Sequence, residues 1–108
     1  MFKLQKPESV KWPVEVNIPR DGGHTTKATF NAQFRIIDQD EFSGIYDQKG
    51  TDRDLISRVC VGWDQTVCDE SGEPIPFSEE ALDSMVNIPY VRTAMVKAYL
   101  DCANGRKN

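Results

Sequence analysis

Two segments in the first third of the chain alternate apolar and polar residues with a period of two, the pattern of half-buried β-strands. In residues 10–18 every even position is apolar. Residues 25–37 repeat the alternation, and their apolar face holds Ala28, Phe30, Ala32, Phe34 and Ile36. Between them, residues 19–24 contain Asp-Gly and Gly-Gly, which favour a tight turn. We therefore predict a β-hairpin with one apolar face. Because Pro13 lacks an N–H group, it indicates either an edge strand or the end of a strand.

Further along the chain the period changes to that of α-helices. Asp38 precedes Glu41 by three residues, a weak form of the capping box, and Thr51 precedes Asp54 by the same interval. Two short helices are predicted after these caps, with a break at Gly50 between them. Their apolar stripes are Phe42, Ile45 and Tyr46 in the first helix and Leu55, Ile56 and Val59 in the second.

A third strand is predicted near residues 60–67, where β-branched and aromatic residues gather. Residues 69–74 have the composition of a turn, and Pro74 and Pro76 keep residues 75–77 extended. Ser78 is a good N-cap for a helix that follows. The apolar face of this helix consists of Ala81, Leu82, Met85 and Val86.

The last helix is predicted from about Pro89, a favoured first helical residue, to Ala103, with Asn104-Gly105 as its C-cap. Residues 106–108 are expected to form a frayed tail. The apolar stripe of the helix is Val91, Ala94, Met95, Ala98, Tyr99 and Cys102.

The order of these elements predicts one α+β domain over residues 1–108. A small antiparallel sheet, formed by the N-terminal β-hairpin and the third strand, would pack against several short helices and a C-terminal helix. The chain has 108 residues, of which 39% are hydrophobic and 28% charged, as in a small globular domain.

Charge is distributed unevenly along the chain. Residues 1–37 carry six Lys or Arg and three Asp or Glu. Residues 38–86 carry three basic and thirteen acidic residues, and residues 87–108 carry four basic residues and one acidic residue. The net charge of −4 therefore combines an acidic middle of −10 with two basic ends of +3 each. An acidic middle argues against nucleic acid as the main partner, because binding there depends on clustered Lys and Arg. We expect this stretch to form the solvated side of the domain, away from the hairpin and last helix that form most of the core.

The sequence also indicates a cellular compartment. It contains no run of about 18 apolar residues, and residues 1–7 lack the apolar stretch of a signal peptide. The three cysteines, Cys60, Cys68 and Cys102, are odd in number and widely spaced, so reduced thiols are expected. Cys60 lies in an apolar run and is predicted to be a core residue. These features predict a cytoplasmic protein.

Few residues suggest catalysis or metal binding. His24 is the only histidine, and no nucleophile with an acidic partner accompanies it in a known motif. The three cysteines with His24 would supply four zinc ligands, but no pair has the close spacing of structural zinc sites. The acidic residues after positions 38 and 51 are better explained as helix starts than as cation ligands. We predict no enzymatic activity and no cofactor.

A set of short motifs, taken in order, resembles the tail assembly chaperones of long-tailed, non-contractile (siphophage-type) bacteriophages and prophages. The likeness extends from Phe2 to Tyr99. The motifs are Phe2-Lys3-Leu4, Pro13-Val14-Glu15-Val16 with Ile18-Pro19 and Asp21-Gly22, Ala28-Thr29-Phe30 with Ala32-Gln33-Phe34, Val61-Gly62-Trp63, Pro76-Phe77-Ser78-Glu79-Glu80, and Ile88-Pro89-Tyr90-Val91-Arg92.

This resemblance implies a non-enzymatic role in virion morphogenesis. Proteins of this kind act in the cytoplasm of the infected or lysogenic bacterial host. They bind the long, helical tape measure protein and keep it soluble while the tail tube protein polymerises around it, and they are absent from the mature virion. Many are also made as a longer, frameshifted product that contacts the tube protein. The resemblance further implies self-association into a homo-oligomer, because the chaperone coats a long target.

The residues that would contact such a partner are hydrophobic side chains beyond the needs of a small core, together with acidic residues of the middle stretch. The alternative for each hydrophobic residue is that it closes the core from its edge. The candidates are Phe42, Ile45, Tyr46, Glu70, Glu73, Ile75, Phe77, Glu79, Glu80 and Ile88.

Two other functions remain as alternatives. The protein would be a structural head–tail or tail-tube component if it stayed in the virion. It would be a small hydrolase or metal-dependent enzyme if folding brought His24 and at least two acidic side chains into one cleft.

Overall fold

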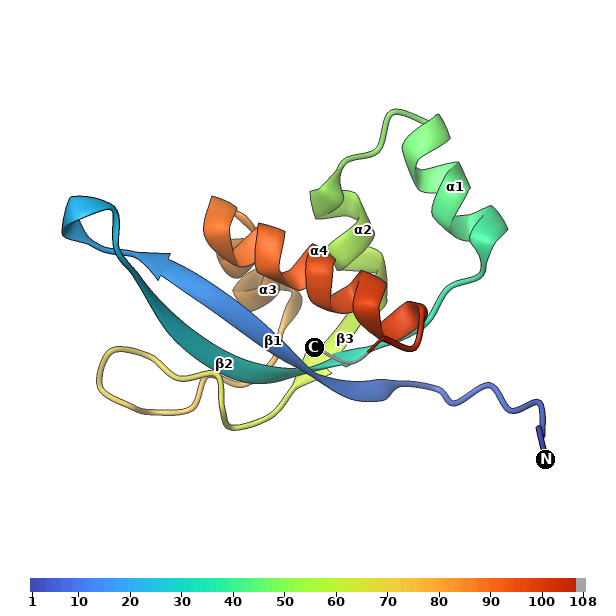
Figure 1. The fold of residues 1–108 in the computed structure, drawn as a ribbon, viewed down its shortest axis with the longest axis horizontal. Helices are drawn as coiled ribbons and strands as arrows, with labels where there is room; N and C mark the ends of the chain where they lie inside the picture. Colours follow the sequence, from blue (N-terminus) through green and yellow to red (C-terminus); the bar gives the residue numbers. More distant parts are fainter. Residues whose placement is uncertain (107–108) are drawn as a thin grey trace.

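The computed structural model describes residues 1–106 and contains a three-stranded antiparallel sheet in the order β1-β2-β3 (Figure 1). The strands are β1 (Val10–Pro19), β2 (Thr25–Phe34) and β3 (Cys60–Trp63). β1 pairs with β2 in a register that sets Val14 opposite Phe30. Because directly paired residues share a face, the apolar positions of both strands lie on the same side of the sheet. The predicted hairpin is confirmed.

The hairpin turn depends on two glycines. A 3₁₀ turn at Asp21–Gly23 joins the strands, and Gly22 and Gly23 have φ angles of 78° and 81°. These angles lie in the left-handed region, where a residue without Cβ is favoured.

Pro13 lies at the outer edge of the sheet, as predicted. Its partner across the strands is Asn31. The backbone N–H of Asn31 donates to Thr66 Oγ1 at 2.9 Å and its carbonyl accepts from the N–H of Asp64 at 3.3 Å, both on the side away from β1. Pro13 and Asn31 are therefore not a hydrogen-bonded pair, and the missing N–H of Pro13 faces the open edge, where it discourages pairing with another strand.

Two strand ends differ from the prediction. β2 ends at Phe34 instead of residue 37, and Ile36, expected on the apolar face, is 43% exposed, whereas Ile37 is 7% exposed. A bulge lies between Gln33 and Phe34 in the pairing with β3, and the chain then turns toward the helices, which shifts the alternation by one residue. β3 ends at Trp63 instead of residue 67, because the side chain of Asp64 accepts a hydrogen bond from the N–H of Thr66 and turns the chain.

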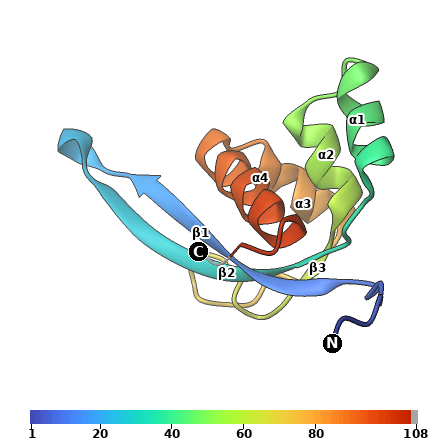
Figure 2. The same ribbon diagram turned by 45° about the vertical axis from the view of Figure 1, so that its right-hand side comes forward.

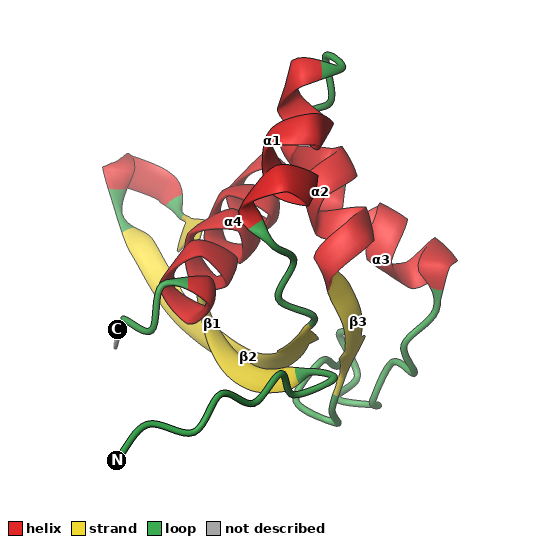
Figure 3. Ribbon diagram, turned by 90° about the vertical axis from the view of Figure 1, so that its right-hand side faces the viewer, coloured by secondary structure: helices red, strands yellow, loops and turns green. Residues whose placement is uncertain are grey.

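The described helices are α1 (Gln39–Asp47), α2 (Asp52–Val59), α3 (Glu79–Val86) and α4 (Pro89–Ala103). All lie on one face of the sheet (Figures 2 and 3). The predicted caps are present: Asp38 accepts from the N–H of Glu41, Thr51 and Asp54 form a capping box, and Ser78 caps α3. The domain is α+β with a C-terminal helix, as the order of elements predicted.

α4 packs over β1 and contributes the longest buried stripe. Its buried residues are Val91, Ala94, Met95, Ala98, Tyr99 and Cys102, as predicted. The Tyr99 ring meets Phe34 edge to face at 5.6 Å, and its hydroxyl accepts a hydrogen bond from the N–H of Ile37 at 3.2 Å. Asn104 is the C-cap, and Gly105 follows with φ of 68°. Of the expected tail, Lys107 and Asn108 lie outside the described residues.

The acidic middle contributes more to the core than its charge suggested. Of the 21 buried hydrophobic residues, nine come from residues 38–86. The hairpin and α4 together supply eleven of them. The hairpin and α4 thus form just over half of the core, as expected, but the acidic middle is not only a solvated side. α2 and α3 each bury one side and expose charged residues on the other, and three of the four residues of β3 are buried.

The long axis of the molecule, 45 Å, ends in two projections (Figure 1). At one end the tip of the hairpin extends beyond the helices. At the other end residues 1–9 leave the start of β1 without regular structure. None of the described helices is both long and apolar enough to cross a lipid bilayer.

Candidate functional site

The three candidate residues of α1 lie together beside α2. Ile45 is buried, Phe42 is half-buried against the core, and Tyr46 is 37% exposed. The rings of Phe42 and Tyr46 lie 5.3 Å apart, and the Tyr46 hydroxyl donates to Asp52 at 2.8 Å. Burial and the Asp52 carboxylate raise the pKa of Tyr46 to about 12. Ile45 thus belongs to the core, and only the Tyr46 edge of the group faces solvent.

Glu41 connects α1 to the rest of the fold. Its carboxylate accepts hydrogen bonds from Arg58 at 2.9 Å and Arg35 at 3.2 Å. The bond from Arg58, with the contribution of Arg35, holds the pKa of Glu41 below its usual value. These contacts join α1, the end of α2 and the segment after β2 through one carboxylate.

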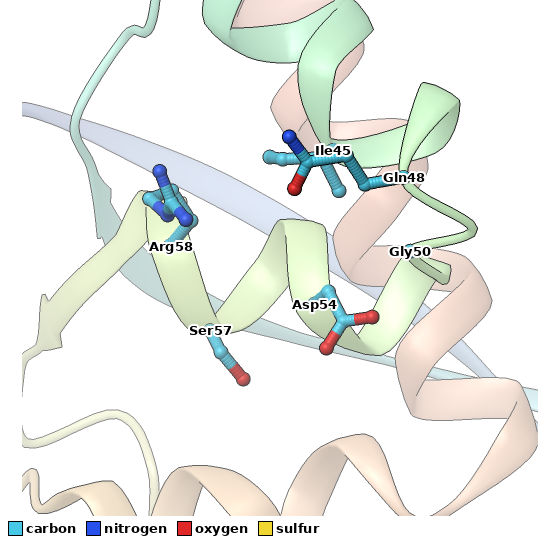
Figure 4. Close-up of a pocket in the computed structure, with 6 residues that line it drawn as sticks. All are labelled: Ile45, Gln48, Gly50, Asp54, Ser57 and Arg58. Atoms are coloured by element: carbon cyan, nitrogen blue, oxygen red, sulfur yellow. The ribbon is translucent and has the colours of Figure 1, made fainter.

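A hollow of about 500 Å³ lies between α1 and α2 (Figure 4). It is lined by Ile45, Gln48, Gly50, Asp54, Ser57 and Arg58. Its two charged side chains already have partners: Asp54 accepts from the N–H of Thr51 at 2.8 Å, and Arg58 binds Glu41. The hollow therefore presents helix-capping and ion-pairing groups, without a nucleophile and base in contact.

The candidate residues of the proline-rich connection pack against Trp63. The Phe77 ring meets the Trp63 ring edge to face at 4.9 Å, and Trp63 Nε1–H donates to the carbonyl of Ile75 at 2.7 Å. Ile75 and Phe77 are both half-buried against the core. Part of each side chain closes the core, and part stays accessible.

The four candidate glutamates are exposed and lie on two elements. Glu70 and Glu73 belong to a small turn whose ends are bridged at Cys68 and Pro74. Within the turn the Asp69 carboxylate accepts from the N–H groups of Ser71 and Glu73 at 2.8 and 3.0 Å. Glu79 and Glu80 occupy the first turn of α3, where the helix dipole favours negative charge.

The ten candidate residues do not form one surface. α1, with its three, lies on the far side of the molecule from the segment 64–77 in both Figure 1 and Figure 3. Ile88, 39% exposed, is the N-cap of α4. A partner contacting α1 and a partner contacting the connection would therefore approach from different sides.

An apolar groove of about 280 Å³ lies where the hairpin extends beyond the helices, and we call it the hairpin groove. β1, β2, the segment after β3, the end of α3 and the start of α4 surround it. Ten of the twelve residues that line it are apolar, and the other two are threonines. The lining residues are Val16, Ile18, Ala28, Thr29, Phe30, Thr66, Val67, Cys68, Ile75, Met85, Tyr90 and Val91.

The outer wall of the hairpin groove is held by Asp64. Its carboxylate accepts hydrogen bonds from Asn31 Nδ2 at 3.2 Å and from the hydroxyl and N–H of Thr66, and Lys11 lies 3.6 Å away. These contacts lower the pKa of Asp64 to about 2, and the hydrogen bonds from Thr66 contribute most. The wall is thus fastened to the hairpin by a carboxylate that remains ionised at neutral pH.

Negative charge adjoins the groove. Cys68 and Ile75 line it, and the turn that carries Asp69, Glu70 and Glu73 joins these two positions. We call residues 69–73 the acidic turn. The arrangement sets carboxylates beside an apolar surface, which suits a ligand that carries apolar and basic side chains side by side.

Sequence reasoning found only Ile75 among the groove residues. It assigned Val16, Phe30, Met85 and Val91 to the core, to which they also contribute. Tyr90 is 37% exposed and lies one position before the buried stripe of α4. An aromatic residue outside the buried stripe of a helix is a signal that could have pointed to a contact residue here, although it does not locate the groove.

The residues that suggested chemistry are dispersed. His24 is exposed in the hairpin loop, Cys60 and Cys102 are buried, and Cys68 is exposed. Burial raises the pKa of Cys60 to about 11. Within residues 1–106, no three His, Cys, Asp or Glu side chains lie close enough together to hold a metal ion. The three cysteines and His24, which the sequence already made unsuitable as a zinc site, are therefore not brought together among the described residues.

Comparisons of the chain with models of protein families, with characterised proteins and with solved structures give no match.

Proposed function

We propose that the protein is a non-enzymatic tail assembly chaperone of a bacteriophage or prophage, which binds and solubilises the tape measure protein during tail morphogenesis. Two observations support this proposal. The ordered motifs from Phe2 to Tyr99 resemble that family. The observation that carries it is the hairpin groove, an apolar hollow beside the acidic turn on an acidic protein.

The groove suits an amphipathic helix. A helix is about 10 Å wide, so a hollow of 280 Å³ receives side chains from one of its faces, spaced at i and i+3 or i+4. Each apolar side chain removed from water contributes about 1.5–3 kcal/mol. Tyr90 and Ile75 offer contact area, while the acidic turn attracts Lys and Arg that flank the apolar stripe. Such contacts would recognise the pattern of apolar and basic residues and not a particular sequence, as a chaperone of a long helical target requires.

The charge of the protein supports the solubilising role. Residues 38–86 carry a net charge of −10, and the glutamates of the acidic turn and of α3 are exposed. A chaperone that covers apolar stripes and adds negative charge reduces the association of its targets. In this proposal the protein acts in the cytoplasm of the bacterial host, leaves before the virion matures, and meets the tail tube protein as a second partner.

The test is co-expression with the tape measure protein encoded by the same phage or prophage. The wild-type protein should keep the tape measure protein soluble and co-purify with it. Tyr90→Lys puts a charge in the groove at an exposed position, so it should lower the soluble fraction several-fold with an unchanged circular dichroism spectrum. Val61→Lys, at a residue of β3 that is 44% exposed and outside the groove, is the matched control.

Three double variants test the acidic residues. Glu70→Lys with Glu73→Lys should weaken solubilisation, and Glu79→Lys with Glu80→Lys shows whether the α3 glutamates share the role. Asp40→Lys with Asp47→Lys changes the net charge equally at exposed sites of α1, on the far side of the molecule from the acidic turn (Figure 1). If all pairs behave alike, the total charge matters and the acidic turn does not. If the tape measure protein stayed insoluble when it is co-expressed with the wild-type protein, the proposal would be contradicted.

The alternative, a head–tail or tail-tube component, is distinguished by mass spectrometry of purified virions. A chaperone should be absent from the particles, whereas a structural component should be present in stoichiometric amounts.

A further inference from the structure

One basic side chain lies on the hairpin side of the hairpin groove. The Nε–H of Arg20, an exposed residue that follows β1, donates to the hydroxyl of Thr26 at 3.1 Å. Thr26 pairs with Ile18 across the strands, and Ile18 lines the groove. Because directly paired residues share a face of the sheet, this hydrogen bond holds the Arg20 guanidinium on the groove side of the hairpin.

The guanidinium of Arg20 has no carboxylate partner within residues 1–106. None of the ion pairs there includes it, although Asp21 is the next residue. A guanidinium has five N–H donors in a planar fork, and the bond to Thr26 uses one of them. The other donors remain available to carbonyl or carboxylate oxygens of a ligand in the groove.

The hairpin groove therefore has opposite charges on its two sides. Ile18 lines one side, beside Arg20. Cys68 and Ile75 line the other side, where the acidic turn begins and ends. This turn carries three carboxylates and no basic residue. Figure 1 shows the hairpin tip and the loop of residues 64–77 extending toward the same end of the molecule, apart from each other.

The other charged residues of this region leave the arrangement intact. Lys27 pairs with Asn17, one position along from Thr26, so its side chain points to the opposite face of the sheet, where it lies 3.8 Å from Glu15. Arg92 donates to the carbonyl of Val86 at 2.9 Å. Asp21 weakens the long-range field of Arg20, but the guanidinium still donates hydrogen bonds at contact distance.

Both sides of the groove favour the same direction of a bound helix. A helix leaves N–H groups free at its N-terminal end and carbonyls free at its C-terminal end, equivalent to about half a positive and half a negative charge. The acidic turn attracts the first end and Arg20 attracts the second. Basic side chains in the N-terminal turns and acidic side chains in the C-terminal turns strengthen both contacts.

We infer that the hairpin groove binds an amphipathic helix in one direction, with its N-terminal end at the acidic turn and its C-terminal end at Arg20. The ligand class is a helix whose apolar stripe is preceded by Lys or Arg and followed by Asp or Glu. This inference rests on the proposed binding of a helix in the groove, and it adds the order of charges along that helix.

Two synthetic peptides test the direction. Both have about 18 residues, or about five helical turns, with blocked ends and the same apolar stripe of leucines. The forward peptide carries lysines in its first turn and glutamates in its last turn, and the reverse peptide exchanges them. Isothermal titration calorimetry should show that the full-length protein binds the forward peptide about tenfold more tightly, because several exposed ion pairs change from attraction to repulsion.

A protein with exchanged charges separates this effect from the peptides' own helical stability. Arg20→Glu combined with Glu70→Lys and Glu73→Lys should bind the reverse peptide more tightly than the forward one. Lys27→Glu is the matched control, because it makes the same charge change on the opposite face of the hairpin, and it should keep the preference of the wild-type protein. Circular dichroism verifies that each variant folds.

The outcomes distinguish this inference from the proposed function. If the wild-type protein binds both peptides equally, or if the preference survives the charge exchange, the inference is wrong while helix binding in the groove stands. If neither peptide binds, helix binding in the groove and the inference fail together. Solubility of the tape measure protein in the co-expression experiment then decides the proposed function separately.

Disulfide trapping measures the direction itself. Cys68 is exposed in the groove beside the acidic turn, whereas Cys60 and Cys102 are buried. Forward peptides carry one cysteine at either end, activated as a thiopyridyl disulfide. The Cys68 thiolate attacks the peptide sulfur, forms the mixed disulfide and releases thiopyridone. The N-terminal cysteine should react several-fold faster than the C-terminal one, and Cys68→Ser should remove both reactions. Equal rates, or a faster C-terminal cysteine, overturn the inference.

Discussion

Helices α1 and α4 both pack one side against the core, yet the fold holds them by different forces. α4 has fifteen residues and buries six of them against β1 and α2, whereas α1 has nine and buries only Ile45. Polar contacts hold α1: the Asp38 cap, the bonds of Glu41 to two arginines, and the bond from Tyr46 to Asp52. A helix stabilised by burial is insensitive to pH and salt, while one held by exposed ion pairs responds to both.

This comparison predicts that α1 opens locally at a lower free energy than α4. Local openings in proteins range from near zero up to the global free energy of unfolding, and elements with few buried contacts lie at the low end. Three substitution experiments test the difference, in order of expected effect.

The largest effect should come from the α4 stripe. Met95 is fully buried, and Met95→Ala should lower the free energy of unfolding by about 2–5 kcal/mol because it leaves a cavity in the core. Phe42→Ala removes a larger but only half-buried side chain from α1 and should cost clearly less. Urea denaturation measures both. Equal losses would mean that α1 is part of the core and that the comparison fails.

An intermediate effect should come from the close approach that ends α1. A Cβ at Gly50 would lie 2.2 Å from the carbonyl oxygen of Ile45, a backbone atom that cannot move aside easily. Gly50→Ala should therefore destabilise the protein by about 1–3 kcal/mol. Gly44→Ala is the control, because nothing lies within 4 Å of a Cβ there, and it should stabilise α1 by about 0.5–1 kcal/mol. A harmless Gly50→Ala would show that α1 shifts freely on α2.

The smallest effect should be the pH dependence of α1. The pKa of Glu41 is lowered in the folded protein, so its contribution is complete above the ordinary value of 4.5 and is lost as the pH falls through the lower folded pKa. Protection factors of α1 amides, measured by hydrogen exchange, should fall over this range before those of α4.

Glu41→Gln is the control for that measurement and should remove most of the pH dependence of α1. Asp64, with a pKa of about 2, stays mostly ionised in the same range, so the wall of the hairpin groove should keep its protection. If the amides of α1 and α4 lost protection over the same pH range, the two helices would open together.

Local features of the sequence predicted most of the elements. Asp38, Thr51 and Ser78 cap the helices they precede, because capping needs only a hydrogen bond to an N–H three residues on. The stripe of α4 was predicted residue by residue, since a long helix packed on a sheet has one buried face. Ile36 was misplaced because a bulge depends on the pairing of β2 with β3, which local alternation does not report.

The hairpin groove could not be predicted, because it arises from a mismatch in length. A ten-residue strand spans about 33 Å, whereas the fifteen-residue α4 spans about 22 Å. The helix therefore leaves the far part of the hairpin uncovered, and Ile18 and Ala28 line an open groove there. Which part remains open depends on where α4 lies along β1, a contact between residues more than 70 positions apart.

The sequence by itself determined the hairpin, the helix boundaries, the buried face of α4 and the segregation of charge. These follow from periodicity, capping and turn chemistry, which act over a few residues. Only the tertiary structure decided that the acidic middle supplies nine of the buried hydrophobic residues, that the candidate contacts lie on two sides, and that an apolar groove lies beside the hairpin. The reason is physical: an apolar residue is buried or exposed according to what packs over it, and the segments that pack together here are distant in sequence.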